Sequence, residues 1–399
     1  MKGNKYIPWL VAILFFLRLG PYFVWEYESF YFSYGLTLAI SLLFFLHAKK
    51  LNKDDKLLYF TYFLAAIAYG VANHNAMVGA FVILLGIIAF SEEDFNRKVF
   101  SSFISLFSIL VGLGVVSWLM IYFGALQPIG TVETISEDVS KQSGYLVYPF
   151  TIMIANSDAI RFRGMFDEPG VIGSYSAILL CINRFNLKDW RSYPLILSGI
   201  LSFSFFFYII LFVYIAFQLV FIKKKPSYFV LFLVLIAGSF SLTKNNDIIY
   251  ELLWRRFEWD AEAVQFVGDN RSGAESAIEL FYQNIKGTKQ YWFGVDNKDQ
   301  LLSILNESSS YKNAILLYGM LFFLLYCFFF VFYGFKNITN RNAFWVYSLV
   351  FIGMVYQRPS IYEPLLLFLF TYFARSFKES EKGVISHNVG FMPMNAMKV

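Results

Sequence analysis

The sequence predicts an all-α polytopic membrane protein with about 12 transmembrane helices, cytoplasmic N and C termini, and a large periplasmic or extracytoplasmic loop subdomain. Its apolar share, its scarcity of charge and its repeated apolar runs predict this class. Hydrophobic residues form 58% of the chain and charged residues 15%, whereas soluble domains carry roughly 45–50% and about 25%. A lipid environment allows so much apolar side-chain surface to face outwards, because the helices satisfy their own backbone hydrogen bonds.

A helix needs about 20 apolar residues to cross the hydrocarbon core. The stretch 193–222 is apolar throughout but too long for one helix, and both its flanks are basic. We therefore expect two short helices that meet near Ser202 and Ser204. The segments that reach or approach the required length are 6–24, 30–48, 57–73, 76–90, 99–125, 170–185, 192–204, 205–222, 227–243, 311–335, 343–357 and 362–377.

Lysine and arginine are distributed unequally between alternate loops. Each short loop on the predicted cytoplasmic side carries at least two, whereas the opposite loops at 25–29 and 73–75 carry none. Short cytoplasmic loops are enriched in these residues, so both termini are expected inside. The predicted regions are 1–125 and 170–243 (transmembrane helices), 126–169 (first outer segment), 244–310 (large outer loop subdomain), 311–377 (last transmembrane helices) and 378–399 (cytoplasmic tail).

Several function classes have no support in the composition. The net charge of +5 is modest, and no basic block is longer than Lys223-Lys224-Lys225, so nucleic acid is not an expected partner. Cys181 and Cys327 both lie in apolar runs, which excludes a thiolate metal site in the polar segments. No Walker-type loop is present. We expect no metal and no other cofactor.

The run Arg161-Phe-Arg-Gly-Met-Phe-Asp-Glu-Pro-Gly170 lies where the first outer segment re-enters the membrane. Gly164 permits a tight turn, which would fold Arg161 and Arg163 over the mouth of the following helix. Two guanidinium groups at a membrane surface suit a phosphate or a diphosphate. The alternative is a membrane-interface anchor whose arginines extend to lipid headgroups.

The end of this run carries the signals of a helix start. Pro169 suits the first turn of a helix, where its missing N–H costs nothing. Asp167 and Glu168 would then lie at the positive end of the helix dipole, and Asp167 is expected to cap the helix.

These residues resemble a family signature. Arg-x-x-Gly-x-Phe-x-x-Pro before a transmembrane helix looks like the motif of the O-antigen polymerase and ligase superfamily, and the fuller run is similar to the polymerase (Wzy-type) branch. The match covers about 99–335. The weaker similarities downstream of the run are Arg271, Phe293-Gly294-Val295, Ser308-Ser309-Ser310-Tyr311, Tyr318-Gly319, and the polar break Ser202-Phe203-Ser204.

The resemblance implies a multi-pass enzyme of the bacterial inner membrane. Such enzymes transfer a glycan chain from undecaprenyl diphosphate onto a lipid-linked repeat unit, forming a glycosidic bond on the outer face. The implied partners are the lipid-linked oligosaccharides, the lipid bilayer and a chain-length regulator.

The resemblance also suggests which residues form the site. Arg161, Arg163 and Arg271 would stabilise the leaving diphosphate, while Glu168 would act as a general base or only orient an arginine. The candidate substrate-binding residues are Gly164, Asp167, Arg255, Arg256 and Tyr311. For Arg255 and Arg256, a solvated face of the loop is an equally good interpretation.

Two other functions remain open. Ligases of the superfamily carry a histidine in the second large loop, whereas this chain has only His47, His74 and His387, which favours a polymerase. A transporter of lipid-linked oligosaccharide would show charges deep among broken helices, whereas here the charged clusters lie in the two outer segments.

Overall fold

The computed structural model describes residues 6–27, 30–72, 76–133, 144–155, 161–222, 224–261, 265–267, 277–295, 311–357 and 363–381. Within these residues the chain is predominantly helical. The helices are α1 (Ile7–Arg18), α2 (Phe30–Phe45), α3 (Lys53–Ala72), α4 (Ala76–Leu85), α5 (Glu93–Tyr122), α6 (Pro169–Ile182), α7 (Ser192–Leu201), α8 (Phe205–Phe217), α9 (Pro226–Thr243), α10 (Asp247–Ile249), α11 (Ala277–Ile285), α12 (Lys289–Phe293), α14 (Tyr311–Asn337), α15 (Arg341–Gln357) and α16 (Pro364–Glu381).

Shorter 3-10 and π-helices extend or join these elements. The 3-10 helices are η1 (Tyr22–Tyr27), η2 (Gly86–Phe90) and η6 (Arg255–Phe257), and the π-helices are η4 (Gln218–Ile222) and η5 (Tyr250–Trp254).

Three of the described helices are long and apolar enough to cross a membrane: α5, α9 and α14. They have 30, 18 and 27 residues, and α9 at about 1.5 Å per residue comes close to the roughly 30 Å of a hydrocarbon core. The structure is thus compatible with a helical membrane protein. Most other apolar helices have 10–17 residues.

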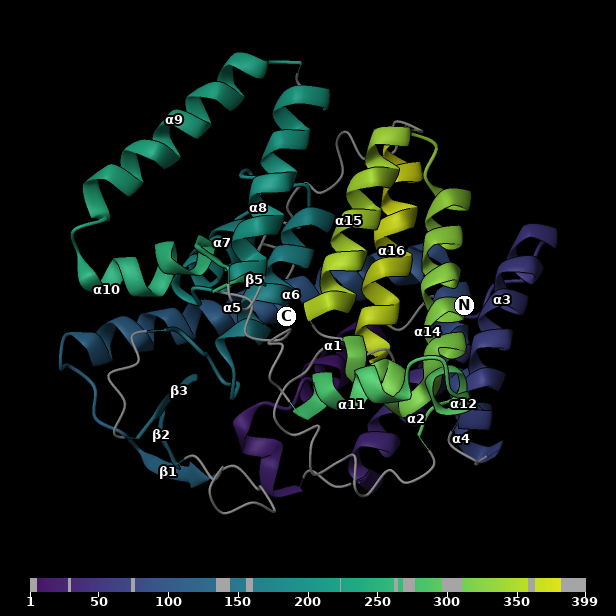
Figure 1. The fold of residues 1–399 in the computed structure, drawn as a ribbon. Helices are drawn as coiled ribbons and strands as arrows, with labels where there is room; N and C mark the ends of the chain where they lie inside the picture. The colour runs from purple at the N-terminus through teal and green to yellow at the C-terminus, as the bar shows by residue number, and fades with distance from the viewer. Residues whose placement is uncertain are drawn as a thin grey trace, which may run out of the picture.

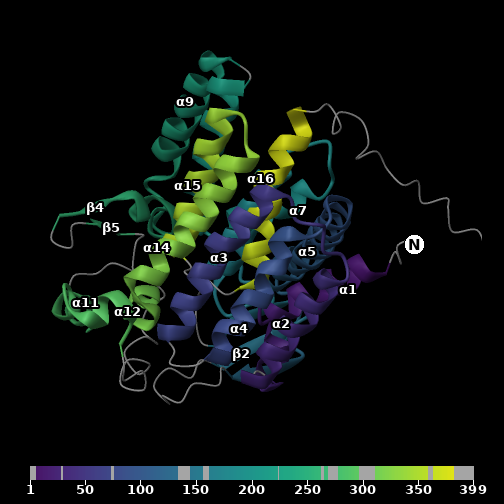
Figure 2. The same ribbon diagram turned by 90° about the vertical axis from the view of Figure 1, so that its right-hand side faces the viewer.

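The core is built largely from aromatic rings. α14, α15 and α16 run side by side (Figures 1 and 2), and α14 also packs against α3. Phe15 of α1 packs on Phe44, Phe103 and Phe368, with ring centroids 5.3–6.1 Å apart. Aromatic pairs at such distances contribute about 0.5–1.5 kcal/mol beyond their buried area. The many phenylalanines therefore pack helix against helix, as well as covering the outside.

The helix pair between the two outer segments breaks where the sequence predicts. α7 ends at Leu201 and α8 begins at Phe205, so that Ser202, Phe203 and Ser204 form the break. Phe203 has a φ of +47°, which is unusual for a bulky residue. The prediction of two short helices at 192–222 is confirmed.

The first outer segment contains an antiparallel sheet that the all-α prediction lacks. β1 (Gly130–Glu133), β2 (Gly144–Tyr148) and β3 (Thr151–Ile154) pair in that order. The sheet lies at the same end of the molecule as α11 and α12 (Figure 1). In β2, Tyr145, Val147 and Tyr148 are buried, and the strands are rich in β-branched and aromatic side chains, which favour strands. A two-residue pair, β4 (Trp259–Asp260) and β5 (Gln265–Phe266), extends from the second outer segment (Figure 2).

Candidate functional site

The Arg161–Gly170 run is fixed on both sides by backbone hydrogen bonds. The N–H of Ile152 in β3 donates to the Gly164 carbonyl at 2.8 Å, and the N–H of Tyr22 donates to the Met165 carbonyl at 2.8 Å. Gly164 has a φ of +56°, a backbone conformation that glycine adopts without a steric penalty. The turn predicted there is therefore present.

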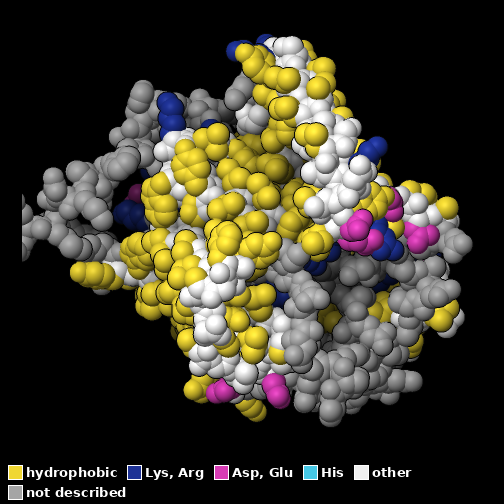
Figure 3. All heavy atoms as spheres, turned by 90° about the vertical axis from the view of Figure 1, so that its left-hand side faces the viewer, with side chains coloured by type: hydrophobic (Ala, Val, Ile, Leu, Met, Phe, Trp, Pro, Cys, Tyr) yellow, Lys and Arg dark blue, Asp and Glu magenta, His cyan; other side chains and the backbone are white. Residues whose placement is uncertain are grey.

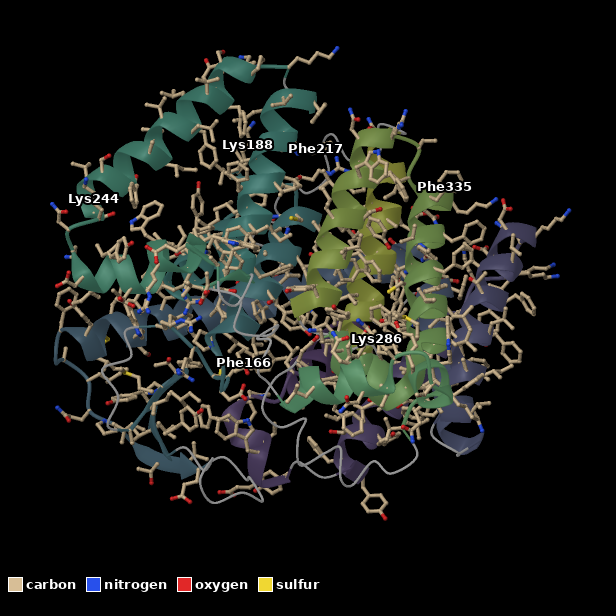
Figure 4. All side chains as sticks on the ribbon, viewed as in Figure 1. Phe166, Lys188, Phe217, Lys244, Lys286 and Phe335 are labelled. Atoms are coloured by element: carbon tan, nitrogen blue, oxygen red, sulfur yellow. The ribbon has the colours of Figure 1, made fainter. Side chains whose placement is uncertain are left out.

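The phenylalanines of this run anchor it, and the arginines remain accessible. Phe162 and Phe166 are 0% and 1% exposed, respectively, whereas Arg161 and Arg163 are only partly buried. Phe166 lies inside the molecule against Phe16 of α1, with ring centroids 5.9 Å apart (Figure 4). Burial of the apolar residues thus fixes where the two guanidinium groups emerge.

Arg161 binds the carbonyl groups at the break between α7 and α8. Its Nε donates to the Ser202 carbonyl at 3.1 Å and its Nη2 donates to the Phe203 carbonyl at 3.3 Å. The C-terminal carbonyls of a helix lack helical partners and carry partial negative charge. A cation at this position therefore holds the strained break in place and itself gains fixed acceptors.

Close packing of α6 on the same break supports this arrangement. A Cβ atom added at Gly173 would come within 2.2 Å of the Ser204 Cβ atom. Only a glycine in α6 allows this approach, so α6, the break and Arg161 form one packed unit.

Arg163 lies on the sheet side of the run. Its guanidinium carbon lies 5.9 Å from the centroid of the Tyr145 ring in β2, and its Nη1 donates to the Asp167 carbonyl. Burial lowers the pKa of Arg163, and the charges of Tyr145, Asp167 and Glu168 act in the opposite direction. The sheet that the sequence did not predict therefore supplies the aromatic wall for this arginine.

A third guanidinium group comes from the second outer segment. Arg256 in η6 is partly buried, and its neighbour Phe257 packs on Phe205 at the start of α8, with ring centroids 5.1 Å apart. Arg256 lies close enough to Arg161 for their charges to interact. Arg255, by contrast, is exposed and forms an ion pair with Glu251 at 2.6 Å.

The charges of this arginine cluster, defined as Arg161, Arg163 and Arg256, are not balanced. Burial lowers the pKa of Arg161, the cations Arg256 and Arg163 lower it further, and Glu168 only partly opposes them, which leaves a pKa of about 9. A guanidinium among other cations is stabilised by any anion that enters. The arrangement can therefore bind a phosphate or diphosphate group. The side of the molecule in Figure 3 has a broad apolar area, with Lys and Arg side chains at several places around it.

The two carboxylates of the run lie at the start of α6, and both are exposed. Pro169 occupies the first turn, as predicted. The prediction that Asp167 caps the helix is wrong: Glu168 occupies the N-cap position, and its side chain makes no capping hydrogen bond. The extended backbone that the following proline imposes falls on Glu168, which places the cap there.

The remaining predicted site residues lie elsewhere. Tyr311, at the start of α14, stacks on Tyr356 with ring centroids 5.8 Å apart. Arg271 lies outside the described residues. Arg18, the last residue of α1, is 3.7 Å from Glu363.

Sequence reasoning missed Tyr208. Its hydroxyl donates to the Ile200 carbonyl at 2.8 Å, and its ring position in α8 brings it within electrostatic range of both Arg161 and Arg256. In the sequence it is one aromatic residue within the apolar run 205–217. Its only signal is its position one helical turn after the polar break.

Two of the downstream motifs, Phe293-Gly294-Val295 and Tyr318-Gly319, pack on each other. The Val295 N–H donates to the Leu316 carbonyl at 3.0 Å. Gly294 and Gly319 have φ values of +90° and +84°, and a Cβ atom at Gly319 would come within 2.3 Å of the Trp292 carbonyl oxygen. This contact docks α12 onto the kink in α14.

Among the described residues, no group of three or more His, Cys, Asp or Glu side chains is placed to hold a metal ion. Comparison of the chain with family models, curated proteins and solved structures finds no match.

Proposed function

We propose that this chain is a polysaccharide polymerase of the bacterial inner membrane, with about twelve transmembrane helices and both termini in the cytoplasm. It would transfer a glycan from undecaprenyl diphosphate onto a lipid-linked repeat unit on the outer face, with a chain-length regulator as a further partner. The resemblance of the Arg161–Gly170 run to O-antigen polymerases supports this proposal. The observation that carries it is the arginine cluster, in which two outer segments contribute guanidinium groups to one place.

The proposed reaction is a substitution at the anomeric carbon of the donor. The acceptor hydroxyl oxygen attacks this carbon, the bond from the carbon to the diphosphate oxygen breaks, and the electron pair leaves with the diphosphate. Arg161, Arg163 and Arg256 would stabilise the negative charge that develops there. The hydroxyl proton passes to a base, for which Glu168 is the candidate because it lies beside the cluster.

The purified protein in proteoliposomes, supplied with lipid-linked repeat units, tests this function. A polymerase gives a ladder of longer lipid-linked products. Movement of the substrate across the bilayer with no covalent change would instead identify a transporter, and transfer of the glycan to a different acceptor would identify a ligase.

Replacing Arg161 by alanine should abolish the ladder. Because Arg161 also holds the α7–α8 break, thermal stability and membrane insertion must be measured on the same preparation. Wild-type product lengths from a correctly inserted Arg161→Ala protein would remove this arginine from the mechanism.

A further inference from the structure

Helix α9 is unusual because it is the only one of the three described membrane-length helices with no buried residue. It follows α8 directly, after η4, and the two helices are close where the chain turns between them (Figure 1). There Phe212 of α8 contacts Phe229 and Phe232 of α9, with ring centroids 5.8 and 6.2 Å apart. From this end the two helices diverge.

The C-terminal end of α9 and the N-terminal end of α8 are connected to the arginine cluster by the segments that follow and precede them. In Figure 4, Lys244 marks the far end of α9, well away from α8, whereas Phe217 lies at the end where the helices meet. Beyond Lys244 the chain returns through η5 and η6, and the Trp254 Nε1 donates to the Thr243 Oγ1 at 2.7 Å. This return brings Phe257 against Phe205 at the start of α8 and Arg256 within electrostatic range of Arg161.

The facing sides of α8 and α9, which diverge from the Phe212 contact and are here called the wedge, carry apolar residues. On α8, Ile209 is 38% exposed and Phe212 is 38% exposed. On α9, the less exposed positions are Phe229, Phe232, Ile236 and, at the C-terminal end, Thr243. The first three are apolar, and they recur at helical spacing and so form one stripe.

Tyr208 joins the apolar wedge to the charged site. It precedes Ile209 in α8, and its ring lies within electrostatic range of Arg161 and Arg256. An apolar wedge that leads to a cluster of cations is complementary to an amphiphile with an anionic head and a long apolar tail.

We propose that the wedge between α8 and α9 holds the isoprenoid chain of the lipid whose diphosphate the arginine cluster binds. This inference rests on the proposed function, because it takes its ligand from it, and it adds a route by which the lipid enters sideways from the bilayer. The isoprenoid chain extends from the bilayer between the two helices, and the diphosphate head group binds Arg161 and Arg256. Phe212, Phe229 and Phe232 close the wedge at the end where α8 and α9 meet.

Site-specific photo-crosslinking tests this placement. A photoreactive phenylalanine analogue is introduced at Ile236, on the stripe, or at Val234, which is 60% exposed and lies about 200° around the helix from Ile236. The full-length protein is placed in phosphatidylethanolamine and phosphatidylglycerol vesicles that contain labelled undecaprenyl diphosphate. We expect several-fold more label at position 236 than at position 234.

The dependence on the head group separates a bound lipid from bulk lipid. The excess of label at position 236 should disappear when Arg161 and Arg256 are both replaced by alanine. Equal labelling at the two positions, or labelling that survives the loss of both arginines, would overturn the proposal.

A second variant keeps the inference testable if the crosslinker disturbs α9. Ile209→Trp narrows the wedge without touching the arginines, so undecaprenyl diphosphate should bind several-fold more weakly while inorganic pyrophosphate binds as before. Unchanged lipid binding would contradict the proposal. The crosslinking and lipid-binding measurements do not require catalysis. Polymer formed without selective labelling would refute only the placement of the lipid chain between α8 and α9. Selective labelling without polymer would refute only the proposed function.

Discussion

Arg255 and Arg256 are adjacent in the sequence but lie in different surroundings, so they form a matched pair for testing the anion site. Arg256 is partly buried and within electrostatic range of Arg161, whereas Arg255 is exposed and paired with Glu251. Hydrogen bonds to charged groups contribute about 1.5–3 kcal/mol each. Replacing Arg256 by alanine should therefore weaken diphosphate binding by about 10- to 150-fold.

The same change at Arg255 removes only an exposed ion pair, for which we expect a change of no more than about twofold. Titration calorimetry with inorganic pyrophosphate measures both variants, and the polymerisation ladder provides the second assay. Arg256→Lys keeps the charge but loses the planar fork, so its affinity should fall between those of the wild type and the alanine variant. Equal losses at positions 255 and 256, or no loss at 256, would refute the assignment of Arg256 to the site.

The remaining predictions concern stability. Pyrophosphate at 100 times the Kd should stabilise the wild type against unfolding by about 2.7 kcal/mol and so raise its melting temperature, but not that of Arg161→Ala; equal rises would place the ligand elsewhere. Gly319→Ala should destabilise the protein by more than about 2 kcal/mol, because its φ is +84° and a Cβ would strike the Trp292 carbonyl. Gly238→Ala, inside α9 with open space around it, should not lower stability in the same melting assay, because alanine favours a helix interior. Asp189→Asn should cost about 3 kcal/mol at pH 7, because it leaves the Arg191 guanidinium, 10% exposed, without its carboxylate. Hydrogen bonds and charge from Arg191 keep the pKa of Asp189 below its ordinary value despite burial, so this contribution is complete above about pH 4 and is lost at lower pH; a stability difference between wild type and Asp189→Asn that does not shrink in acid would contradict it.

Local signals in the sequence were sufficient for several features. Pro169 indicated the start of α6, and the pair Ser202 and Ser204 indicated the break between α7 and α8. Each of these depends on one or two residues and their immediate neighbours. Such local features can be predicted because backbone geometry and helix propensity determine them.

Features that depend on distant residues could not be predicted in the same way. Arg18 of α1 pairs with Glu363, which is contributed by the other end of the chain. The difference between Arg255 and Arg256 depends on the contact of Phe257 with Phe205. No local pattern indicates which of two adjacent arginines faces the protein.

The sheet was missed for a different reason. In a chain with 58% hydrophobic residues, the apolar patch at 145–155 reads as one more hydrophobic stretch. Its strands have only four or five residues each, too few for a clear alternation. Their pairing across a turn, rather than the composition of any one strand, stabilises them.

The length of α7 has a consequence for the surrounding lipid. With 10 residues, this helix extends for about 15 Å, well short of the roughly 30 Å of a typical hydrocarbon core, and its Tyr193, Leu197 and Ile200 side chains are exposed. Hydrophobic mismatch of this kind is relieved by thinning of the adjacent leaflets. In the proposed placement the bilayer would therefore dip towards Arg161, so that a headgroup reaches the cluster with less of its tail withdrawn from the hydrocarbon.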